Sequence, residues 1–292
     1  MLASVTGLFR RPRTPPSAAE ARRAERAPPA PLAVPAEAPA RLDWPVERMT
    51  VADALWGPGF TLPGGEAEVL RLAAPLGLSA ACSVLLVGCG AGGPARCLAE
   101  RLETWVDGFE HDPALLAVAK RRCAAAGLGR RTRIEAWDPA APRFPARASH
   151  HALALEPLRH GTAALVLPAI AAALRPGGNL VLIETVAEAA APLADWLRAE
   201  RREPPPTAAA VTRALEGLGF DVRVVEDMTE RHVQLTVRGW RALVEAMGEE
   251  RPTPARAAPV VREAERWLRR ARLMRSGQVR LMRWHALGRE AT

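Results

Sequence analysis

The stretch "VLLVGCGAGG" at 84–93 constrains the fold of this 292-residue chain more than any other segment. An apolar run that ends in glycines and continues into a helical pattern is typical of a β-strand that turns tightly into an α-helix. Gly88 permits the tight turn, and Gly90 and Gly92 let the main chain pass close to a ligand without a Cβ clash. The segment therefore predicts a ligand-binding turn, which also contains Cys89, at the start of a parallel βαβ unit.

Strand-like and helix-like patterns alternate along the chain, which predicts an α/β fold. A last strand that follows a helical insertion suits a Rossmann-like mixed sheet of seven strands, the last antiparallel, with helices on both faces. Strands are expected at 83–87, 104–109, 132–136, 151–155, 179–184, 220–226 and 278–287. Helices are expected at 93–101, 113–126, 162–174, 207–218, 232–247 and 260–276.

The formal net charge of +8 is concentrated at the two ends of the chain. Residues 1–41 carry +4 and residues 251–292 carry +8, so the segment between them is mildly acidic. Basic ends can contact nucleic acid or an anionic membrane surface, but solvated extensions are the simpler interpretation. The expected helix at 260–276 has an apolar stripe, so its arginines are expected on the solvated face and nucleic acid is not favoured as a partner. The stripe comprises Val261, Ala264, Trp267, Leu268, Ala271 and Met274.

The cysteines are not spaced as metal ligands or as a disulfide framework, so we expect reduced thiols and no metal site. They are Cys82, Cys89, Cys97 and Cys123. No apolar run approaches the ~20 residues needed to span a bilayer. The first residues do not fit a signal peptide, because their charges follow the short apolar segment instead of preceding it. We therefore expect a cytoplasmic protein.

The glycines alone fit two ligands, a nicotinamide dinucleotide and S-adenosylmethionine. Glu110 follows Gly88 at the end of the second expected strand, where a carboxylate can accept hydrogen bonds from both ribose hydroxyls. Gly88, Gly90 and Gly93 also satisfy the G-x-G-x-x-G pattern of dinucleotide-binding folds. At this point an NAD-dependent oxidoreductase stays open as an alternative.

Several further blocks, in the right order, resemble the class I S-adenosylmethionine-dependent methyltransferases. They are "VLLVGCGAGGPARCLAE", "VDGFEHDP", "IEAWDP", "HALALEPLRH" and "LRPGGNLVLIE". The segment "LWGPGFTLPGG" is similar to the small-molecule branch that contains the phosphoethanolamine, quinone and sterol methyltransferases. The resemblance covers residues 44–287. It implies S-adenosyl-L-methionine as cofactor and in-line transfer of a methyl group to a small-molecule amine, hydroxyl or activated carbon.

The resemblance also implies roles for individual residues. Trp44, Trp56 and Trp240 are candidates for the substrate pocket, because an aromatic face can hold a sulfonium or an ammonium by cation–π attraction. Next to the transferring methyl group the resemblance places Glu156 and His160, with His160 as the general base. The residues implied to bind the cofactor are Gly88, Cys89, Gly90, Gly92, Glu110, His111, Trp137 and Asp138.

The sequence departs from the family pattern at two points that bear on activity. Leu86 stands where the family often has an acidic residue that helps to hold the cofactor amine. The chain has no tyrosine, and Trp44 stands where the phosphoethanolamine enzymes pair a tyrosine with the histidine that His160 resembles. Specificity for phosphobases is therefore not implied, and a methyltransferase-like binding protein without turnover is an alternative.

These observations divide the chain into a tail and one folded domain. Residues 1–40 are rich in Pro, Ala and Arg and lack apolar periodicity, so we expect them to be disordered. The methyltransferase domain is expected at 41–292. Within it we expect a covering arm at 41–80, a cofactor-binding core at 81–227, a helical lid insertion at 228–276 and a final strand at 277–288.

Overall fold

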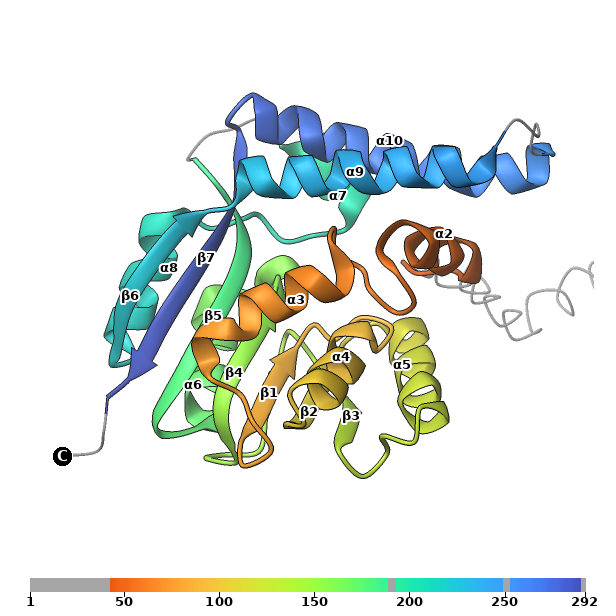
Figure 1. The fold of residues 1–292 in the computed structure, drawn as a ribbon. Coiled ribbons are helices and arrows are strands. Elements are labelled where there is room, and N and C mark those ends of the chain that lie inside the picture. The colour runs from red at the N-terminus through yellow and green to blue at the C-terminus, as the bar shows by residue number, and fades with distance from the viewer. Residues whose placement is uncertain (1–42, 189–192, 249–252, 290–292) are drawn as a thin grey trace, which may run out of the picture. The chain divides into compact units, whose positions relative to one another are not determined.

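Seven strands form one mixed sheet in the computed structural model, which describes residues 43–188, 193–248 and 253–289 (Figure 1). The order across the sheet is β3-β2-β1-β4-β5-β7-β6. The strands β1 to β5 run parallel, and β7 is antiparallel to both of its neighbours. The expected α/β sheet with an antiparallel last strand is therefore confirmed. The strands are β1 (Ser83–Val87), β2 (Trp105–Glu110), β3 (Thr132–Ala136), β4 (Ser149–Leu155), β5 (Leu174–Ala187), β6 (Phe220–Asp227) and β7 (Val279–Gly288).

The helices include all six that the sequence patterns predict. Helix α10 begins at Pro254 instead of 260, because a proline fits the first turn of a helix, where its missing N–H has no partner to lose. Three further helices, α2, α3 and α7, were not predicted. The helical elements are α2 (Val46–Trp56), α3 (Gly65–Ala73), η1 (Ala74–Leu76), α4 (Gly93–Arg101), α5 (Pro113–Ala125), η2 (Pro157–Arg159), α6 (Ala163–Ala173), α7 (Ala194–Glu200), α8 (Ala208–Gly217), α9 (Thr229–Met247) and α10 (Pro254–Arg275). None of these described helices is long and apolar enough to cross a bilayer.

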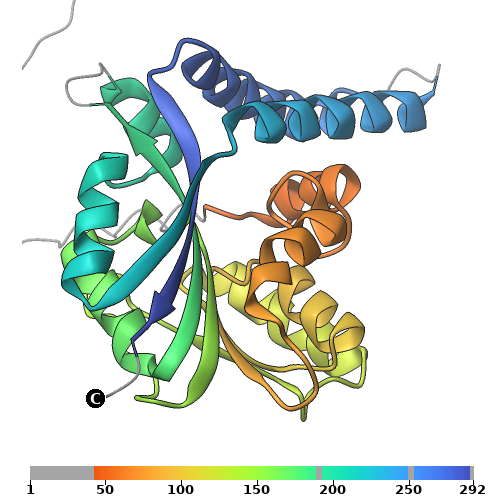
Figure 2. The same ribbon diagram turned by 60° about the vertical axis from the view of Figure 1, so that its left-hand side comes forward.

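The sheet is buried on both faces, and this accounts for the continuous apolar run of β1. Successive side chains of a strand point to opposite faces. Leu86 packs in one core with Leu98 of α4, whereas Leu85 packs in the other with Ile170 of α6 and Leu215 of α8. Figure 2 shows α3 and α4 on one side of the sheet and α8 on the other. A parallel strand covered on both faces is expected to lack polar alternation.

The connection between α2 and α3 is tied down over the glycine turn that follows β1. The Gly93 N–H donates to the Gly59 carbonyl at 3.0 Å, and the Arg96 guanidinium donates to the Pro58 carbonyl at 2.6 Å. Asp53 accepts from the Gly59 N–H at 2.8 Å and pairs with Arg122 of α5. These bonds fix the N-terminal segment next to the helices α4 and α5.

Helices α9 and α10 lie side by side across the end of the sheet where the parallel strands finish (Figures 1 and 2). Two ion pairs join this helical hairpin to the N-terminal helices. Arg231 of α9 pairs with the buried Glu68 of α3 at 2.7 Å, and Glu263 of α10 pairs with Arg48 of α2 at 2.9 Å. The segment expected to be a helical insertion thus forms a cover held by buried charges.

The face that α10 buries differs from the predicted apolar stripe. Val261 and Leu268 are more than half exposed, whereas Glu263 and Arg270 are 2% and 4% exposed. The expectation that the arginines of this helix lie on its solvated face is therefore wrong for Arg270. The reason is that both buried charges have partners of opposite sign on other elements, which a helical pattern does not reveal.

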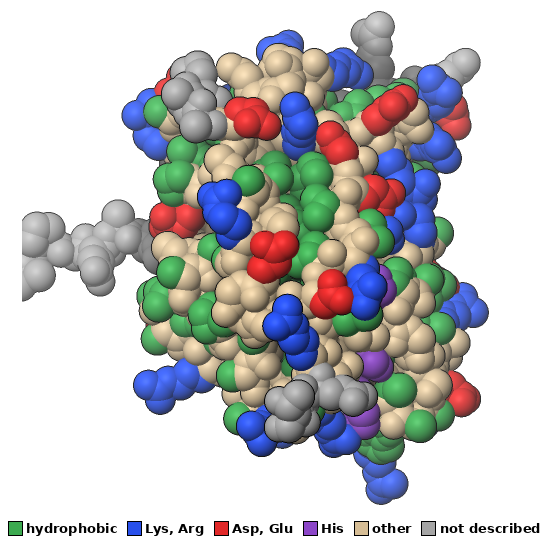
Figure 3. Space-filling view, turned by 90° about the vertical axis from the view of Figure 1, so that its left-hand side faces the viewer, with side chains coloured by type: hydrophobic (Ala, Val, Ile, Leu, Met, Phe, Trp, Pro, Cys, Tyr) green, Lys and Arg blue, Asp and Glu red, His purple; other side chains and the backbone are tan. Residues whose placement is uncertain are grey.

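Strand β6 is an edge of the sheet and carries paired charges. Arg223 pairs with Asp221 at 2.7 Å, and Glu226 pairs with Arg283 of β7 at 2.8 Å. On the face of the molecule seen in Figure 3, basic and acidic side chains are interspersed around exposed apolar ones. Charges on an edge strand disfavour pairing with a strand of another chain.

Candidate active site

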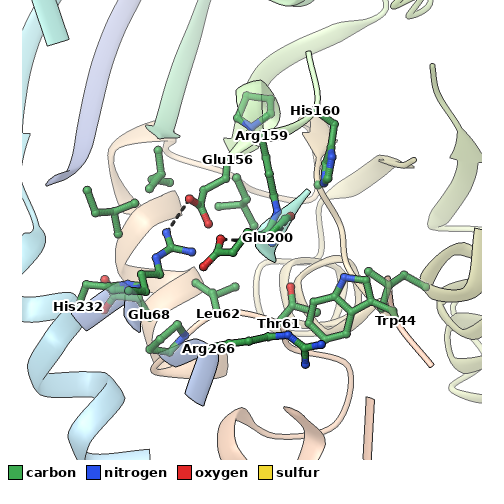
Figure 4. A pocket seen from close by; sticks show the side chains of 18 of the residues that line it. Trp44, Thr61, Leu62, Glu68, Glu156, Arg159, His160, Glu200, His232 and Arg266 are labelled. Carbon is green, nitrogen blue, oxygen red and sulfur yellow. Dashed lines mark hydrogen bonds and ion pairs between the residues drawn. The ribbon is translucent and has the colours of Figure 1, made fainter. Parts of the chain in front are cut away.

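A cavity of about 140 Å³ opens at the carboxyl ends of β1, β2, β4 and β5, where open α/β sheets bind their ligands. The residues that line it come from two sides (Figure 4). We call the lining residues near β1 to β3 the cofactor side, after the role that the resemblance implies for most of them: Gly88, Glu110, His111, Leu115 and Trp137. We call those near the end of β5 and on α9 and α10 the acceptor side, after the acceptor that the expected lid would cover: Ile183, Met228, His232, Leu235, Trp267, Arg270 and Leu281.

The glycine turn adopts backbone conformations that require glycine. Gly88 has φ 80°, and a Cβ there would lie 2.4 Å from the carbonyl oxygen of Leu155. Gly90 has φ 59°, and its Cβ would approach the Thr61 hydroxyl at 3.0 Å, while a Cβ on Gly92 would meet the backbone of α5. Of the four residues predicted in this turn, Gly88 lines the cavity and the other three do not.

Cys89 is fully buried beneath the turn. Burial, together with the charge of Glu110, raises the pKa of its thiol well above the usual range. A thiol that does not ionise is a poor nucleophile. Cys89 therefore has a packing role at the turn, and its backbone N–H donates to the Phe109 carbonyl at 3.2 Å.

Glu110 connects the end of β2 to the glycine turn. Its carboxylate accepts hydrogen bonds from the backbone N–H groups of Gly90 at 2.8 Å, His111 at 3.0 Å and Asp112 at 3.0 Å. The side chain is almost completely buried and lines the cavity. Three backbone donors fix the orientation of the carboxylate, and the Nδ1 atom of His111 lies 3.1 Å from its Oε1 atom. The Oε2 atom accepts from the Gly90 N–H and keeps acceptor capacity, since an ionised carboxylate has about four acceptor sites. The arrangement fits an acid that grips a further hydroxyl.

The last three of the residues predicted to bind the cofactor, His111, Trp137 and Asp138, differ in position. His111 and Trp137 line the cavity, and their rings pack edge to face with centroids 6.4 Å apart. The indole N–H of Trp137 is buried and has no hydrogen-bond partner among the described residues. Asp138 is exposed and outside the cavity lining, and its carboxylate accepts from the Ala140 N–H at 2.9 Å.

His160 stands against His111, with ring centroids 4.0 Å apart. Burial, then the nearby charges of His111 and Arg159, lower the pKa of His160 to about 3. The ring is therefore neutral at physiological pH. His160, the predicted base, lines the cavity next to His111 of the cofactor side. Figure 4 shows it on the opposite side of the cavity from His232.

Glu156 follows β4 with a left-handed backbone, φ 48° and ψ 48°. Left-handed conformations of residues other than glycine are uncommon and cluster at functional sites. Its carboxylate accepts from Arg270 of α10 at 2.6 Å and from the Thr185 hydroxyl. Burial alone would raise the pKa of Glu156, but Arg270, Arg202 and Arg159 outweigh it and hold that pKa well below the usual range.

A second buried acid, Glu184, binds the same arginine, Arg202, that lies close to Glu156. Its carboxylate accepts from the Leu158 N–H at 2.7 Å and pairs with the fully buried Arg202 at 3.3 Å. Arg202 also lies 3.6 Å from Glu156.

The three predicted tryptophans of the substrate pocket do not share one position. Trp44 lines the cavity, with the Arg48 guanidinium 3.8 Å from its ring centroid. Trp56 is 6% exposed and packs edge to face on Trp267, and Trp240 packs against the same core. Trp56 and Trp240 are therefore packing residues outside the cavity lining, since each serves to attach the α9–α10 hairpin to α2.

The sequence analysis missed the polar residues that other elements bring to the cavity. His232 of α9 is 8% exposed, and its Nε2 atom has no hydrogen-bond partner among the described residues. Glu200 at the end of α7 pairs with Arg159 at 3.4 Å. A histidine within an expected helix next to an apolar face was the available signal for His232. No pattern pointed to Glu200, because α7 itself was not predicted.

Four carboxylates that line the cavity are each paired with an arginine. The pairs are Glu68 with Arg231, Glu156 with Arg270, Glu200 with Arg159, and Glu263 with Arg48. The charges of the lining are thus largely balanced within the protein. The described residues contain no group of three or more His, Cys, Asp or Glu side chains that could hold a metal ion.

Comparisons with known proteins agree with this architecture. Residues 84–178 match a family model described as "Methyltransferase domain". No curated protein matches the sequence. Phosphoethanolamine N-methyltransferase 2 of Haemonchus contortus, solved with phosphomonomethylethanolamine and S-adenosylhomocysteine, superposes with a TM-score of 0.71 at 18% identity. The match covers 84% of this chain and 58% of that protein, so this chain spans little more than half of its length.

Two other solved structures have the same fold. The [4+2]-cyclase SpnF superposes with a TM-score of 0.65 at 19% identity, covering 84% of this chain and 94% of SpnF. Geranyl diphosphate C-methyltransferase of Streptomyces coelicolor A3(2), solved with Mg²⁺, geranyl diphosphate and S-adenosylhomocysteine, superposes with a TM-score of 0.59 at 16% identity. That match covers 76% of this chain and 78% of the enzyme. Residues 84–178 are thus similar to a methyltransferase domain, and the chain shares the fold of these solved structures.

Proposed function

We propose that the protein binds S-adenosyl-L-methionine and transfers its methyl group to a small-molecule acceptor. The observation that carries this proposal is the bond between the Gly90 N–H and the Glu110 carboxylate at 2.8 Å. This bond holds the glycine turn, whose conformation a Cβ would disrupt, next to a buried acid. Both lie at the edge of the sheet where α/β folds bind ligands. Trp137, which lines the same cavity, completes a site for an adenosyl group.

The residues fit the cofactor in distinct ways. Gly88 would let the main chain approach the methionine part, the oriented Glu110 would bind the ribose hydroxyls, and His111 and Trp137 would flank the adenine. When bound, the cofactor supplies a methyl group on a positively charged sulfur, which is a good leaving group. The protein's own task is to position the acceptor and exclude water, because alignment supplies much of the rate of such a displacement.

The helices around the cavity are placed for this task. The ion pairs of Glu68 and Glu263 hold α9 and α10 against α3 and α2, and residues of all four helices line the cavity. Apolar side chains of the acceptor side, such as Met228 and Leu281, would exclude water from the reacting end of the acceptor. We propose that residues 228–276 act as the lid of the site and that His160 and Glu156 lie on its rim.

The first test is retention of labelled cofactor in equilibrium dialysis. The proposal expects the protein to retain S-adenosylmethionine labelled with tritium in its methyl group and to retain no labelled NAD. Retention of NAD without S-adenosylmethionine would instead support the oxidoreductase, the other ligand class that the glycines allow.

A second candidate function is binding of the cofactor without methyl transfer. It is favoured by the similarity in fold to SpnF, which is a [4+2]-cyclase, and by Leu86 in place of an acidic residue. Release of S-adenosylhomocysteine in the presence of a metabolite panel separates the two candidates. Release by the wild-type protein but not by Gly90→Arg, which places a side chain where a Cβ already meets Thr61, would reject binding without turnover.

A further inference from the structure

A second cavity, of about 460 Å³, lies at the opposite end of the sheet from the candidate active site (Figure 1). It opens where β5 and β6 begin and β7 ends, next to the last turns of α6 and α8. Arg147, Arg175 and Arg289 line it. Every other lining residue is Ala, Gly, Leu, Phe or Pro, so this lining combines three positive charges with an apolar remainder and includes no acid.

Backbone hydrogen bonds bring the three arginines together around the junction of α6 and β5. The Arg147 N–H donates to the Ala172 carbonyl at 2.9 Å, and the Gly177 N–H donates to the Arg289 carbonyl at 3.4 Å. Arg175 lies between Ala172 and Gly177 in the sequence. Three arginines from distant parts of the chain therefore converge on one cavity.

The positive charge of this cavity is not compensated within the described part of the chain. There, the Arg175 guanidinium donates to Nε2 of His150 at 2.7 Å, and the guanidinium groups of Arg147 and Arg289 have neither a hydrogen bond nor an ion pair. By contrast, each arginine that lines the candidate active site pairs with a glutamate. A concave surface with charges of one sign attracts ligands of the opposite sign.

The backbone of Arg147 is a further indication of a functional role. Its φ of 50° lies in the left-handed region, which is uncommon for residues other than glycine and costs free energy. Glycine or asparagine would adopt this conformation more easily. Strained residues of this kind cluster at ligand sites, which agrees with a function for the Arg147 side chain in the cavity.

We propose that this cavity binds a small organic anion in which a carboxylate or phosphate group is attached to an apolar body. The planar guanidinium of arginine presents N–H donors in a geometry that matches both groups. The apolar body would lie against Pro168 of α6 and against Leu218, whose side chain follows α8 and is 36% exposed. A cation would meet repulsion and no acid here. The proposal does not depend on the proposed methyltransferase function, whose site lies at the other end of the sheet.

The binding test is calorimetric titration of the full-length protein with octanoate and with monooctyl phosphate at low ionic strength, where surface charges are least screened. Octanol has the apolar body without the charge, acetate and inorganic phosphate have the charge without the body, and octyltrimethylammonium reverses the charge. The two octyl anions should bind saturably, at least about tenfold more tightly than any of the other compounds, because charged hydrogen bonds and apolar contact act together. Inorganic phosphate binding as tightly as monooctyl phosphate would indicate an adventitious ion only and would overturn the proposal.

Variants connect the binding to this cavity. Arg147→Asn removes one charge and keeps a residue that tolerates the left-handed backbone, and Arg289→Gln removes another. Each should weaken binding of the octyl anions about threefold to tenfold, as expected for charged hydrogen bonds at a site open to solvent. Ala172→Glu, which adds an acid to the lining, should weaken it further. The matched controls Arg130→Gln, on the exposed surface, and Arg266→Gln, in the lining of the candidate active site, should leave it unchanged.

The same variants separate binding from a structural role of the arginines. Removing one of several charges that repel each other should not lower the free energy of unfolding, so Arg147→Asn and Arg289→Gln should lose affinity and keep the stability of the wild type in urea. Unchanged affinity in both variants would overturn the proposal.

A photoreactive octanoate with a diazirine on its chain locates the site in the wild-type protein without any substitution. The expected labelled peptides contain residues 168–178 or 218–220. Labelling confined to residues that line the candidate active site would overturn the proposal, as would the absence of saturable binding of both octyl anions.

Discussion

Glu110 is the residue at which the glycine turn and the cofactor side of the cavity meet. It is held by three backbone N–H groups, one of them from the turn itself. These donors orient the carboxylate before a ligand arrives, so binding a ligand costs little side-chain entropy at Glu110. We expect Glu110 to contribute directly to cofactor affinity.

The change Glu110→Ala should weaken binding of S-adenosylhomocysteine by about 1.5–3 kcal/mol, the range for hydrogen bonds to a charged group. Calorimetric titration measures the loss. Glu135→Ala, on the neighbouring strand β3, is the matched control, because that carboxylate is 45% exposed and, within the described part of the chain, pairs with Arg133 alone. Unchanged affinity in Glu110→Ala would contradict the ribose assignment.

His232 should also give the folded protein a distinct pH dependence. Its pKa is about 3 in the folded protein and about 6.5 in the unfolded chain, so only the unfolded chain takes up a proton just below neutrality. The stability that the neutral, buried ring contributes is therefore complete above about pH 6.5 and is lost as the pH falls toward 3.

Between about pH 7 and pH 5 this group should remove about 2 kcal/mol from the free energy of unfolding. Urea unfolding of the wild type and of His232→Gln, measured across this range, checks the value, since the variant should lose that share of the acid sensitivity. Identical pH dependence of the two proteins would show that His232 titrates normally in the folded state.

At the scale of elements, attachment of the α9–α10 hairpin depends on a few buried charges. Glu263 is 2% exposed and accepts hydrogen bonds from Arg48 of α2 and from Arg266 and Trp267 of its own helix. Removing a buried partner leaves the remaining charge unpaired, which is more costly than the pair is stabilising. Attachment of the α9–α10 hairpin thus depends on the ion pair between Arg48 of α2 and Glu263 of α10.

The variant Glu263→Gln should lower the free energy of unfolding by about 1.5–3 kcal/mol. It should also increase the hydrogen exchange of α10 near that residue. Glu265→Gln, two positions along the same helix but exposed, should change neither quantity. Equal effects of the two substitutions would show that the ion pair with Arg48 does not hold the helix.

The core elements were predictable because local patterns determine them. Strand β1 and helix α4 have the predicted bounds, since a continuous apolar run, a glycine turn and a helical pattern follow each other without a break. The buried face of α10 was not predictable, because Glu263 and Arg270 are buried through partners on α2 and after β4. Of the five residues that line the cavity near β1 to β3, four were predicted as site residues and only Leu115 was not, whereas His232 on α9 was not predicted.

At the scale of the whole molecule, the described residues belong to one compact unit, Leu42–Thr292. Described residues between Trp44 and Ala286 build both cores of the sheet. Deleting residues 1–40 should therefore leave the melting temperature and the affinity for S-adenosylhomocysteine unchanged. A marked fall in melting temperature, measured by calorimetry or circular dichroism, would show that the N-terminal segment contributes to the fold.

The central claim is that the glycine turn and Glu110 form a site for an adenosyl group at the carboxyl edge of the sheet. The most direct measurement is isothermal titration calorimetry of the purified full-length protein with S-adenosylhomocysteine. The account predicts saturable binding heat with one site per chain, and its loss in Gly90→Arg. An absence of binding heat with both S-adenosylhomocysteine and S-adenosylmethionine would contradict the account.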